Sequence, residues 1–211
     1  HSLHLEERFG VGCHTISVPR MRPTEGVNVQ TFPHLVSDDD FKQMVAVIRL
    51  AVPYTGMILS TREPRGYRDE VIALGISQIS AGSCTGVGGY HRDIERPAED
   101  TGQFQVEDHR TTDEMLQSVC QAGYLPSFCT ACYRQGRTGD RFMALAKTGE
   151  IQNICQPNAI LTFKEFLLDY ASERTKKVGE EALLRHLESV PNARLREEVR
   201  RRLERLEAGE R

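Results

Sequence analysis

The chain has 211 residues and a mass of 23.8 kDa, which is enough for one large domain or two small ones with a buried core. Its 39% hydrophobic and 27% charged residues exclude wholesale disorder, and no apolar stretch approaches the roughly 20 residues of a membrane-spanning helix. The net charge of −3 argues against a protein that neutralises many phosphates. We therefore expect a cytoplasmic protein with neither a nucleic-acid nor a membrane partner.

The N-terminal residues predict the end of a helix. Residues 3–9 have helical apolar spacing, and Gly10 is a typical helix stop. The sequence begins with His1 and shows no signal peptide. We therefore expect this chain to be part of a longer protein.

Strand and helix patterns alternate in the region that follows. Three short apolar strands are predicted, at residues 14–20, 57–60 and 77–83. One helix is predicted from the N-cap Ser37 to Pro53, and another at residues 66–74. This alternation predicts parallel strands joined by right-handed crossovers. Three strands make a poor sheet alone, so we expect an α/β fold in which they close the arc of a (β/α)8 barrel.

Polar side chains occupy the ends of these strands, where such a barrel places its chemistry: Arg20, Ser60, Arg62 and Ser83. Ser60 and Arg62 alternate with Thr61, so both should point to one side of the sheet. An Arg in a barrel mouth calls for an anion, and its planar fork fits a carboxylate. The alternative is an internal salt bridge from Arg62 to Glu63 or Glu70.

The second half of the chain is predicted to be helices and irregular loops. Helices are expected from a capping box at Thr111 to Gly123, at residues 140–148, and from a capping box at Thr162 over residues 163–171. From Lys176 onward the sequence is amphipathic, with an apolar stripe of Leu183, Leu184, Leu187, Leu195, Val199, Leu203 and Leu206. Glutamates interleave the run of arginines at 200–202, which favours a solvated helical face with ion pairs over a partner surface.

Three cysteines in the loops have the spacing of a metal site. Cys129 and Cys132 form a C-x2-C pair, and Cys155 follows after 22 residues. A structural zinc site takes four protein ligands, and a 4Fe–4S cluster normally takes four thiolates, so three thiolates leave one metal position open. An iron–sulfur cluster, a zinc ion with a further ligand, and no metal remain the three interpretations. The other cysteines, at 13, 84 and 120, are expected to be small buried hydrophobic residues.

The cysteine motif and the strand ends resemble one enzyme family. The segment CTACYRQGRTGDRFM that begins at Cys129, with Cys155 behind it, resembles the C-terminal cluster motif of the HydG family, the tyrosine lyases that mature iron–iron hydrogenase. The segments HTISVPR, ILSTRE and SAGS agree with the last barrel strands of that family. The tyrosine lyase of thiamine synthesis, 2-iminoacetate synthase, shares those strands but is not expected to have the three cysteines.

The resemblance implies a radical S-adenosylmethionine (SAM) enzyme with a (β/α)8 TIM-type barrel. Residues 1–92 would be the last strands and helices of that barrel, and residues 93–211 a mainly helical domain that binds an auxiliary 4Fe–4S cluster. The family's N-terminal C-x3-C-x2-C motif, which holds the SAM-binding 4Fe–4S cluster, is not in this sequence. Its ligands are therefore expected outside these residues, and this chain alone is not expected to cleave SAM.

The resemblance also implies an activity for the full-length parent, a carbon–carbon lyase. That enzyme would cleave L-tyrosine to p-cresol and dehydroglycine and convert dehydroglycine to CO and cyanide. The product would be an Fe(CO)2(CN) unit for the hydrogenase H-cluster. Its partners would be L-tyrosine, SAM, a free L-cysteine at the cluster and other hydrogenase maturation proteins.

The resemblance assigns roles to seven residues. Cys129, Cys132 and Cys155 would hold the auxiliary cluster, and the free cysteine would bridge it to an extra iron. His4 would be the protein ligand of that iron, with His1 as second choice. Ser60 and Arg62 would bind the tyrosine carboxylate, and Arg20 would belong to the SAM or substrate pocket.

Two other functions remain open from the sequence. The chain could be a metal-binding or iron-delivery scaffold without radical chemistry, or part of a tyrosine lyase of the 2-iminoacetate synthase type. The three-cysteine motif distinguishes the second of these from the HydG family, and the presence of a SAM motif elsewhere in the parent distinguishes the first.

Overall fold

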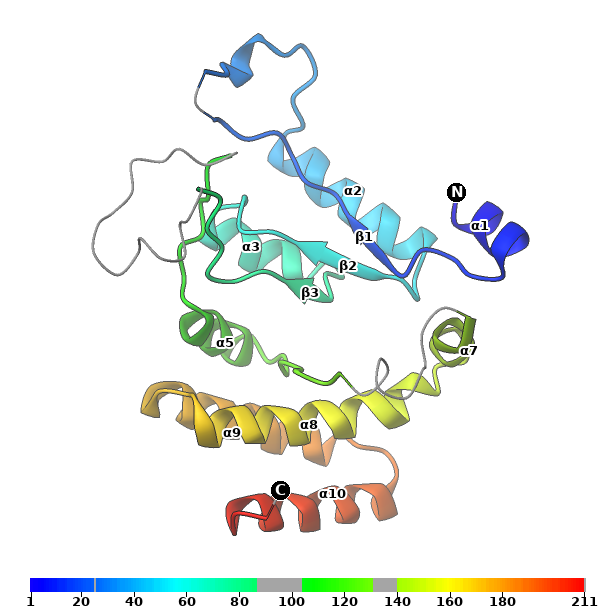
Figure 1. The fold of residues 1–211 in the computed structure, drawn as a ribbon, viewed down its shortest axis with the longest axis vertical. Coiled ribbons are helices and arrows are strands. Elements are labelled where there is room, and N and C mark those ends of the chain that lie inside the picture. Colours follow the sequence, from blue (N-terminus) through cyan, green and yellow to red (C-terminus); the bar gives the residue numbers. More distant parts are fainter. Residues whose placement is uncertain (25, 87–103, 131–139, 211) are drawn as a thin grey trace. The chain divides into compact units, whose positions relative to one another are not determined.

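The structure is a computed structural model that describes residues 1–24, 26–86, 104–130 and 140–210 (Figure 1). The chain forms two compact units. One unit is Cys13–Thr111, and the other combines His1–Gly12 with Thr112–Arg211. No helix in the described ranges is both long and apolar enough to cross a membrane.

The unit Cys13–Thr111 is built on a parallel three-stranded sheet. Its strands are β1 (Thr15–Ser17), β2 (Gly56–Leu59) and β3 (Gln78–Ile79), in the order β1-β2-β3. Helices α2 (Asp38–Ala51) and α3 (Arg65–Ile72) connect the strands (Figure 1). Their buried side chains pack with those of β2 in one core: Phe41, Val45, Met57, Leu59 and Val71. The predicted α/β class with parallel strands is confirmed.

Helix α2 begins where its N-cap chemistry predicted. The Ser37 hydroxyl accepts a hydrogen bond from the Asp40 N–H at 3.1 Å, and three aspartates occupy the first turn. The segment before α2 contains a short 3-10 helix, η1 (Val29–Thr31), which Asn28 caps.

Strands β1 and β3 are shorter than the sequence predicted. Strand β1 ends at Ser17, two residues before Pro19, which has no N–H to give to a sheet. Beyond β3, the Ser80 N–H still donates to the Leu59 carbonyl at 3.2 Å, but Gly82 then turns the chain with a φ of 58°. The chain therefore leaves the sheet earlier than its apolar pattern indicated.

The second unit is helical. It contains α1 (Ser2–Phe9), α5 (Thr112–Gln121), α7 (Asp140–Thr148), α8 (Ile151–Asp169), α9 (Glu173–Glu188) and α10 (Ala193–Glu207). Helix α8 packs against α9 and α10, and α5 packs against α9 (Figure 1). Their core includes Leu116, Cys120, Ile160, Phe163, Leu167, Leu183, Leu187, Val199 and Leu203.

The extent of α8 corrects two predictions. Cys155 lies within this helix and not in a loop, and Thr162 is in its interior, where its hydroxyl donates to the Asn158 carbonyl at 2.8 Å instead of capping a new helix. Pro157 also lies in the interior of α8, where a proline typically costs about 3 kcal/mol. Burial of Ile160, together with the phenylalanine and leucine that follow it on the same face, outweighs that cost.

Two other features of the helical unit were partly predicted. The arginines at 200–202 do form ion pairs with Glu197 and Glu198 along α10, as a solvated face requires. Leu184 is 56% exposed and does not belong to the apolar stripe.

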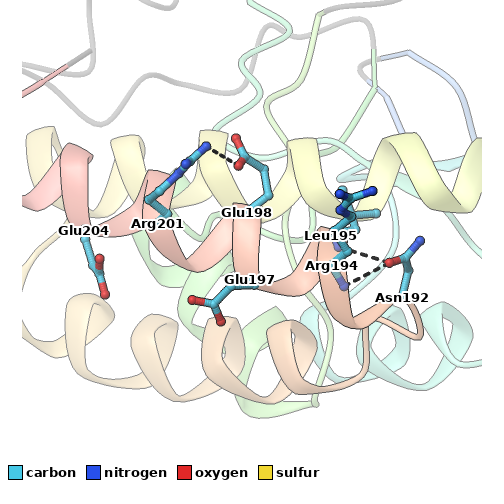
Figure 2. A pocket seen from close by; sticks show the side chains of 7 residues that line it. All are labelled: Asn192, Arg194, Leu195, Glu197, Glu198, Arg201 and Glu204. Atoms are coloured by element: carbon cyan, nitrogen blue, oxygen red, sulfur yellow. Dashed lines mark hydrogen bonds and ion pairs between the residues drawn. The ribbon is translucent and has the colours of Figure 1, made fainter.

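A charged hollow of about 850 Å³ lies along α10, lined by Asn192, Arg194, Leu195, Glu197, Glu198, Arg201 and Glu204 (Figure 2).

The predicted boundary at residues 92/93 lies outside the residues that the structure describes and stays a prediction. The segment 105–110 belongs to the sheet unit because its backbone is bonded there: the Gln105 N–H donates to the Pro23 carbonyl at 2.9 Å, and the Glu107 N–H donates to the Thr61 carbonyl at 3.0 Å. Helix α1 belongs to the helical unit, where Glu6 pairs with Lys147 of α7 at 2.6 Å.

Candidate functional site

The end of β2 presents Ser60 and Arg62 on one face. Burial alternates with period two from Gly56 to Glu63, so that the odd-numbered residues are buried and Ser60 and Arg62 are half-buried. The Ser60 hydroxyl lies 3.4 Å from the Arg62 backbone nitrogen and accepts its hydrogen bond. The two side chains proposed to meet a carboxylate therefore lie next to each other just beyond the strand.

Arg62 stacks on an aromatic ring. Its Cζ atom lies 3.7 Å from the ring centroid of Phe104. Neither alternative salt bridge forms: Glu63 pairs with Arg20 and Arg22, and Glu70 pairs with Lys42. No hydrogen bond or ion pair of the Arg62 guanidinium involves another residue in the described ranges.

Arg20 is in a buried ion cluster. Its side chain is 8% exposed, and its guanidinium donates to both carboxylate oxygens of Glu63 and to Asp38 at 2.7 Å. The rings of Phe41 and Tyr67 lie against it, with centroids 4.8 and 5.0 Å from its Cζ. Burial alone would lower the pKa of Arg20, but the hydrogen bonds to the two carboxylates outweigh burial and raise it. Arg20 thus links the ends of β1 and β2, and its contact with SAM or substrate stays a prediction.

A second buried ion cluster fixes the segment that follows Phe104. Asp108 accepts from Arg68 at 2.5 Å and from Arg110 at 2.6 Å, and Arg110 also pairs with Asp69 at 3.0 Å. Burial would raise the pKa of Asp108, but the hydrogen bonds from the two arginines prevail and lower it to about 2. The carboxylate is therefore charged at neutral pH and fully paired.

The predicted thiol ligands lie on both sides of α7. Cys129 precedes that helix in an irregular segment, Cys155 follows it within α8, and both are half-buried. Cys132 lies outside the described residues. Among the residues that are described, no three metal-binding side chains form a group. Helix α7 ends at Thr148, as the sequence predicted, and the left-handed Gly149 follows it with a φ of 77°.

The accessibility of these two thiols fits a thiolate-ligated group. A thiol must lose its proton to bind a metal, and complete burial in apolar surroundings opposes that loss. Cys120 is the contrasting case: it is fully buried, and desolvation raises its pKa to about 12. Cys13 and Cys84 are half-buried, so only Cys120 matches the buried role that was predicted for these three cysteines.

His4 is exposed on α1, and His1 is at the N-cap of that helix. The ion pair between Glu6 and Lys147 connects α1 to α7, so His4 belongs to the same unit as Cys129 and Cys155. The structure therefore brings these three predicted residues into one unit, whereas Ser60, Arg62 and Arg20 belong to the other.

Sequence reasoning missed Phe104, Asp108 and Arg110. The contact of Phe104 with Arg62 spans 42 positions of sequence, so no local pattern indicates it. The only available signal was the run of charged and polar residues at 107–110 (Glu-Asp-His-Arg) near a single aromatic residue, which is also typical of a solvated loop.

Comparison with known proteins places the chain in a family. The Biotin and Thiamin Synthesis associated domain matches residues 17–125. The 2-iminoacetate synthase of Escherichia coli K12 is 31% identical over 130 residues, which is 60% of this chain and 32% of that enzyme. The Salmonella typhimurium enzyme is 33% identical over 131 residues, with the same shares.

Two solved structures are similar over almost the whole chain. A crystal structure of HydG, a maturase of the FeFe-hydrogenase, has a TM-score of 0.92 and 63% identity and covers 100% of this chain and 45% of that one. The FeFe-hydrogenase maturase HydG from Carboxydothermus hydrogenoformans has a TM-score of 0.70 and 38% identity, over 96% of this chain and 42% of that one. The predicted resemblance to HydG is thereby confirmed. The chain spans about a third of the curated relatives and less than half of the solved structures, and it belongs to the Biotin and Thiamin Synthesis associated domain family.

Proposed function

We propose that this chain is the auxiliary-cluster part of a radical SAM tyrosine lyase of the HydG type. The full-length enzyme would use SAM to cleave L-tyrosine to p-cresol and dehydroglycine. It would then produce CO and cyanide for hydrogenase maturation. The similarity to HydG over 100% of the chain, cysteine region included, is the observation that carries the proposal.

The tyrosine carboxylate would be bound by Arg62 and Ser60. Arg20, Arg68 and Arg110 all have guanidinium groups that are engaged by carboxylates of the protein. Arg62 differs, because within the described ranges its guanidinium face meets a ring and its edge meets no carboxylate. That edge offers two parallel N–H donors to an incoming carboxylate. The hydroxyl of the adjacent Ser60 adds one more hydrogen-bond donor.

Cys129, Cys132 and Cys155 would hold the auxiliary 4Fe–4S cluster. When bound, such a cluster with an extra iron would supply the metal at which the diatomic products are collected as Fe(CO)2(CN). His4 would be a ligand of that iron, and a free L-cysteine would connect it to the cluster. Support for His4 comes from the α1–α7 ion pair, which keeps this exposed histidine in the unit that contains Cys129 and Cys155. The ligands of the SAM-cleaving cluster would lie outside these 211 residues.

A lyase of the 2-iminoacetate synthase type is the second candidate. It is favoured by the 31–33% identity with the two bacterial enzymes. That similarity covers 60% of the chain, whereas the similarity to HydG covers all of it, so the HydG-type activity is better supported.

The test is an anaerobic assay of the full-length protein that contains this chain, reconstituted with iron and sulfide and supplied with tyrosine and SAM. We expect p-cresol together with CO, and iron and sulfide sufficient for two clusters. Formation of p-cresol without CO or cyanide would favour the 2-iminoacetate synthase type. Bound iron with no cleavage of SAM or tyrosine would favour a scaffold that delivers iron.

A further inference from the structure

Phe104 is placed where it can control the guanidinium of Arg62. We infer that Phe104 is a positioning residue for tyrosine binding, which acts by holding Arg62 in the orientation that accepts the substrate carboxylate. This inference rests on the proposed function of Arg62. The observation behind it is the 3.7 Å distance between the Arg62 Cζ and the Phe104 ring centroid, which is a close cation–π contact.

The backbone around Phe104 is hydrogen-bonded to the segments that follow β1, β2 and β3. The Phe104 carbonyl accepts from the Thr85 hydroxyl at 3.1 Å, beyond β3. The next residue donates its N–H to the Pro23 carbonyl at 2.9 Å, beyond β1. The N–H groups of Glu107 and Asp108 donate to the Thr61 carbonyl at 3.0 and 3.1 Å, directly before Arg62. The segment that carries the Phe104 ring is therefore hydrogen-bonded to the residue directly before Arg62.

Buried charge fixes this segment further. Asp108 pairs with Arg68 of α3, and Arg68 also donates to the Ser80 carbonyl at 2.6 Å. Because the Arg68 and Asp108 side chains are fully buried, releasing the segment would leave charges unpaired in the interior. The position of Phe104 is thus determined by the fold and does not depend on a substrate.

Stacking orients an arginine without using its donors. A Cζ-to-centroid distance of 3.7 Å is the spacing of a guanidinium that lies flat on a ring, and in that arrangement the N–H groups point outward in the guanidinium plane. Arg20 shows the other arrangement, since two neighbouring rings lie against its guanidinium and protein carboxylates accept its hydrogen bonds. At Arg62 the edge is left for a ligand, and the ring reduces the rotamer freedom that binding would otherwise remove.

The test compares Phe104→Leu and Phe104→Tyr in the full-length reconstituted enzyme, with p-cresol formation as the assay. We expect Phe104→Leu to raise the KM for tyrosine about 3- to 30-fold, the range of a lost cation–π contact, with kcat within about twofold. Phe104→Tyr keeps the ring and should restore KM to within about twofold. Phe32→Leu is the matched control, because Phe32 is an exposed ring of the same unit.

A double-mutant cycle separates positioning from structural damage. In an Arg62→Ala background, Phe104→Leu should change the tyrosine KM less than about twofold, because the residue it acts through is gone. An equal loss in both backgrounds, or an unchanged KM in the single Leu variant, would overturn the inference. If the wild-type enzyme forms no p-cresol, the proposed function fails instead. Tyrosine affinity measured directly by calorimetry would then still show whether the two residues are coupled.

Discussion

Arg68 and Asp108 form an ion pair of 2.5 Å between Nη1 and Oδ2, and neither side chain is exposed to solvent. Arg110 completes the cluster by donating to the same carboxylate oxygen at 2.6 Å. Removing one partner of a buried ion pair lowers the free energy of unfolding by more than the intact pair contributes to it, because an unpaired charge stays behind in the interior. This carboxylate therefore connects α3 to the segment that places Phe104.

The pKa of Asp108 predicts how the stability of the sheet unit depends on pH. Its folded pKa is about 2, below the ordinary value of 3.8, so the folded state releases this proton more readily than the unfolded state. The resulting stabilisation, about 2 kcal/mol, is present above pH 4 and is lost as the pH falls through 2. Urea unfolding at a series of pH values between 5 and 2 measures it.

The variant Asp108→Asn should abolish that part of the pH dependence. It should also lower the free energy of unfolding at pH 7 by about 3–5 kcal/mol, since two buried arginines lose their common partner. Asp39→Asn, an exposed aspartate in the first turn of α2, is the control and should keep the wild-type slope. A wild-type slope in Asp108→Asn would show that this carboxylate does not titrate as its contacts indicate.

Gly179 makes the close approach of α8 and α9 possible. A Cβ atom at this position would lie 2.6 Å from Leu167 Cδ2 and 3.2 Å from Phe163 Cζ, and both side chains are buried. We expect Gly179→Ala to lower the free energy of unfolding by about 1–2 kcal/mol, because the overpacking outweighs the better helix propensity of Ala.

Gly66→Ala is the matched comparison for Gly179→Ala. Gly66 is also helical, in α3, and a Cβ atom there would have nothing within 4 Å. The Gly66→Ala substitution should therefore raise the free energy of unfolding by about 0.5–1 kcal/mol. Thermal or urea unfolding of both variants checks the pair, and equal signs would contradict the packing argument.

Local signals predicted those elements whose ends are set by local chemistry. The N-cap at Ser37 and the left-handed Gly10, Gly123 and Gly149 predicted helix ends because each acts on backbone groups within one turn. The parallel order of the strands followed from the strand–helix–strand spacing.

What the sequence did not predict depends on contacts distant in the chain. Pro157 is tolerated inside α8 because the residues after it are buried by α9 and α10, which local propensity does not register. Likewise, Ser60 and Arg62 could be selected from strand alternation. Phe104 could not, because its position depends on backbone hydrogen bonds from its segment to Pro23 and Thr61, which are distant in sequence.

Replacement of Arg62 tests the substrate site directly. Arg62→Ala should weaken tyrosine binding by about 2–4 kcal/mol, because a desolvated carboxylate would lose its partner. Arg62→Lys should restore only part of this loss, since an ammonium group cannot make the bidentate contact. Arg65→Ala, which removes an exposed arginine of α3, is the control and should bind tyrosine like the wild type. Calorimetry with the full-length enzyme measures all three, and unchanged affinity in Arg62→Ala would remove Arg62 from the site.

Replacement of Cys155 separates the two activities proposed for the full-length enzyme. Cys155→Ser removes a thiolate that a hydroxyl replaces poorly as an iron ligand, so the auxiliary cluster should be lost and CO formation with it. Tyrosine cleavage should continue, because radical generation would belong to a cluster held elsewhere. We therefore expect p-cresol within about threefold of the wild-type amount and CO below detection, measured in the same anaerobic reaction. Cys13→Ser changes a half-buried cysteine of the other unit and should retain both products. Wild-type CO output from Cys155→Ser would show that Cys155 is not a cluster ligand.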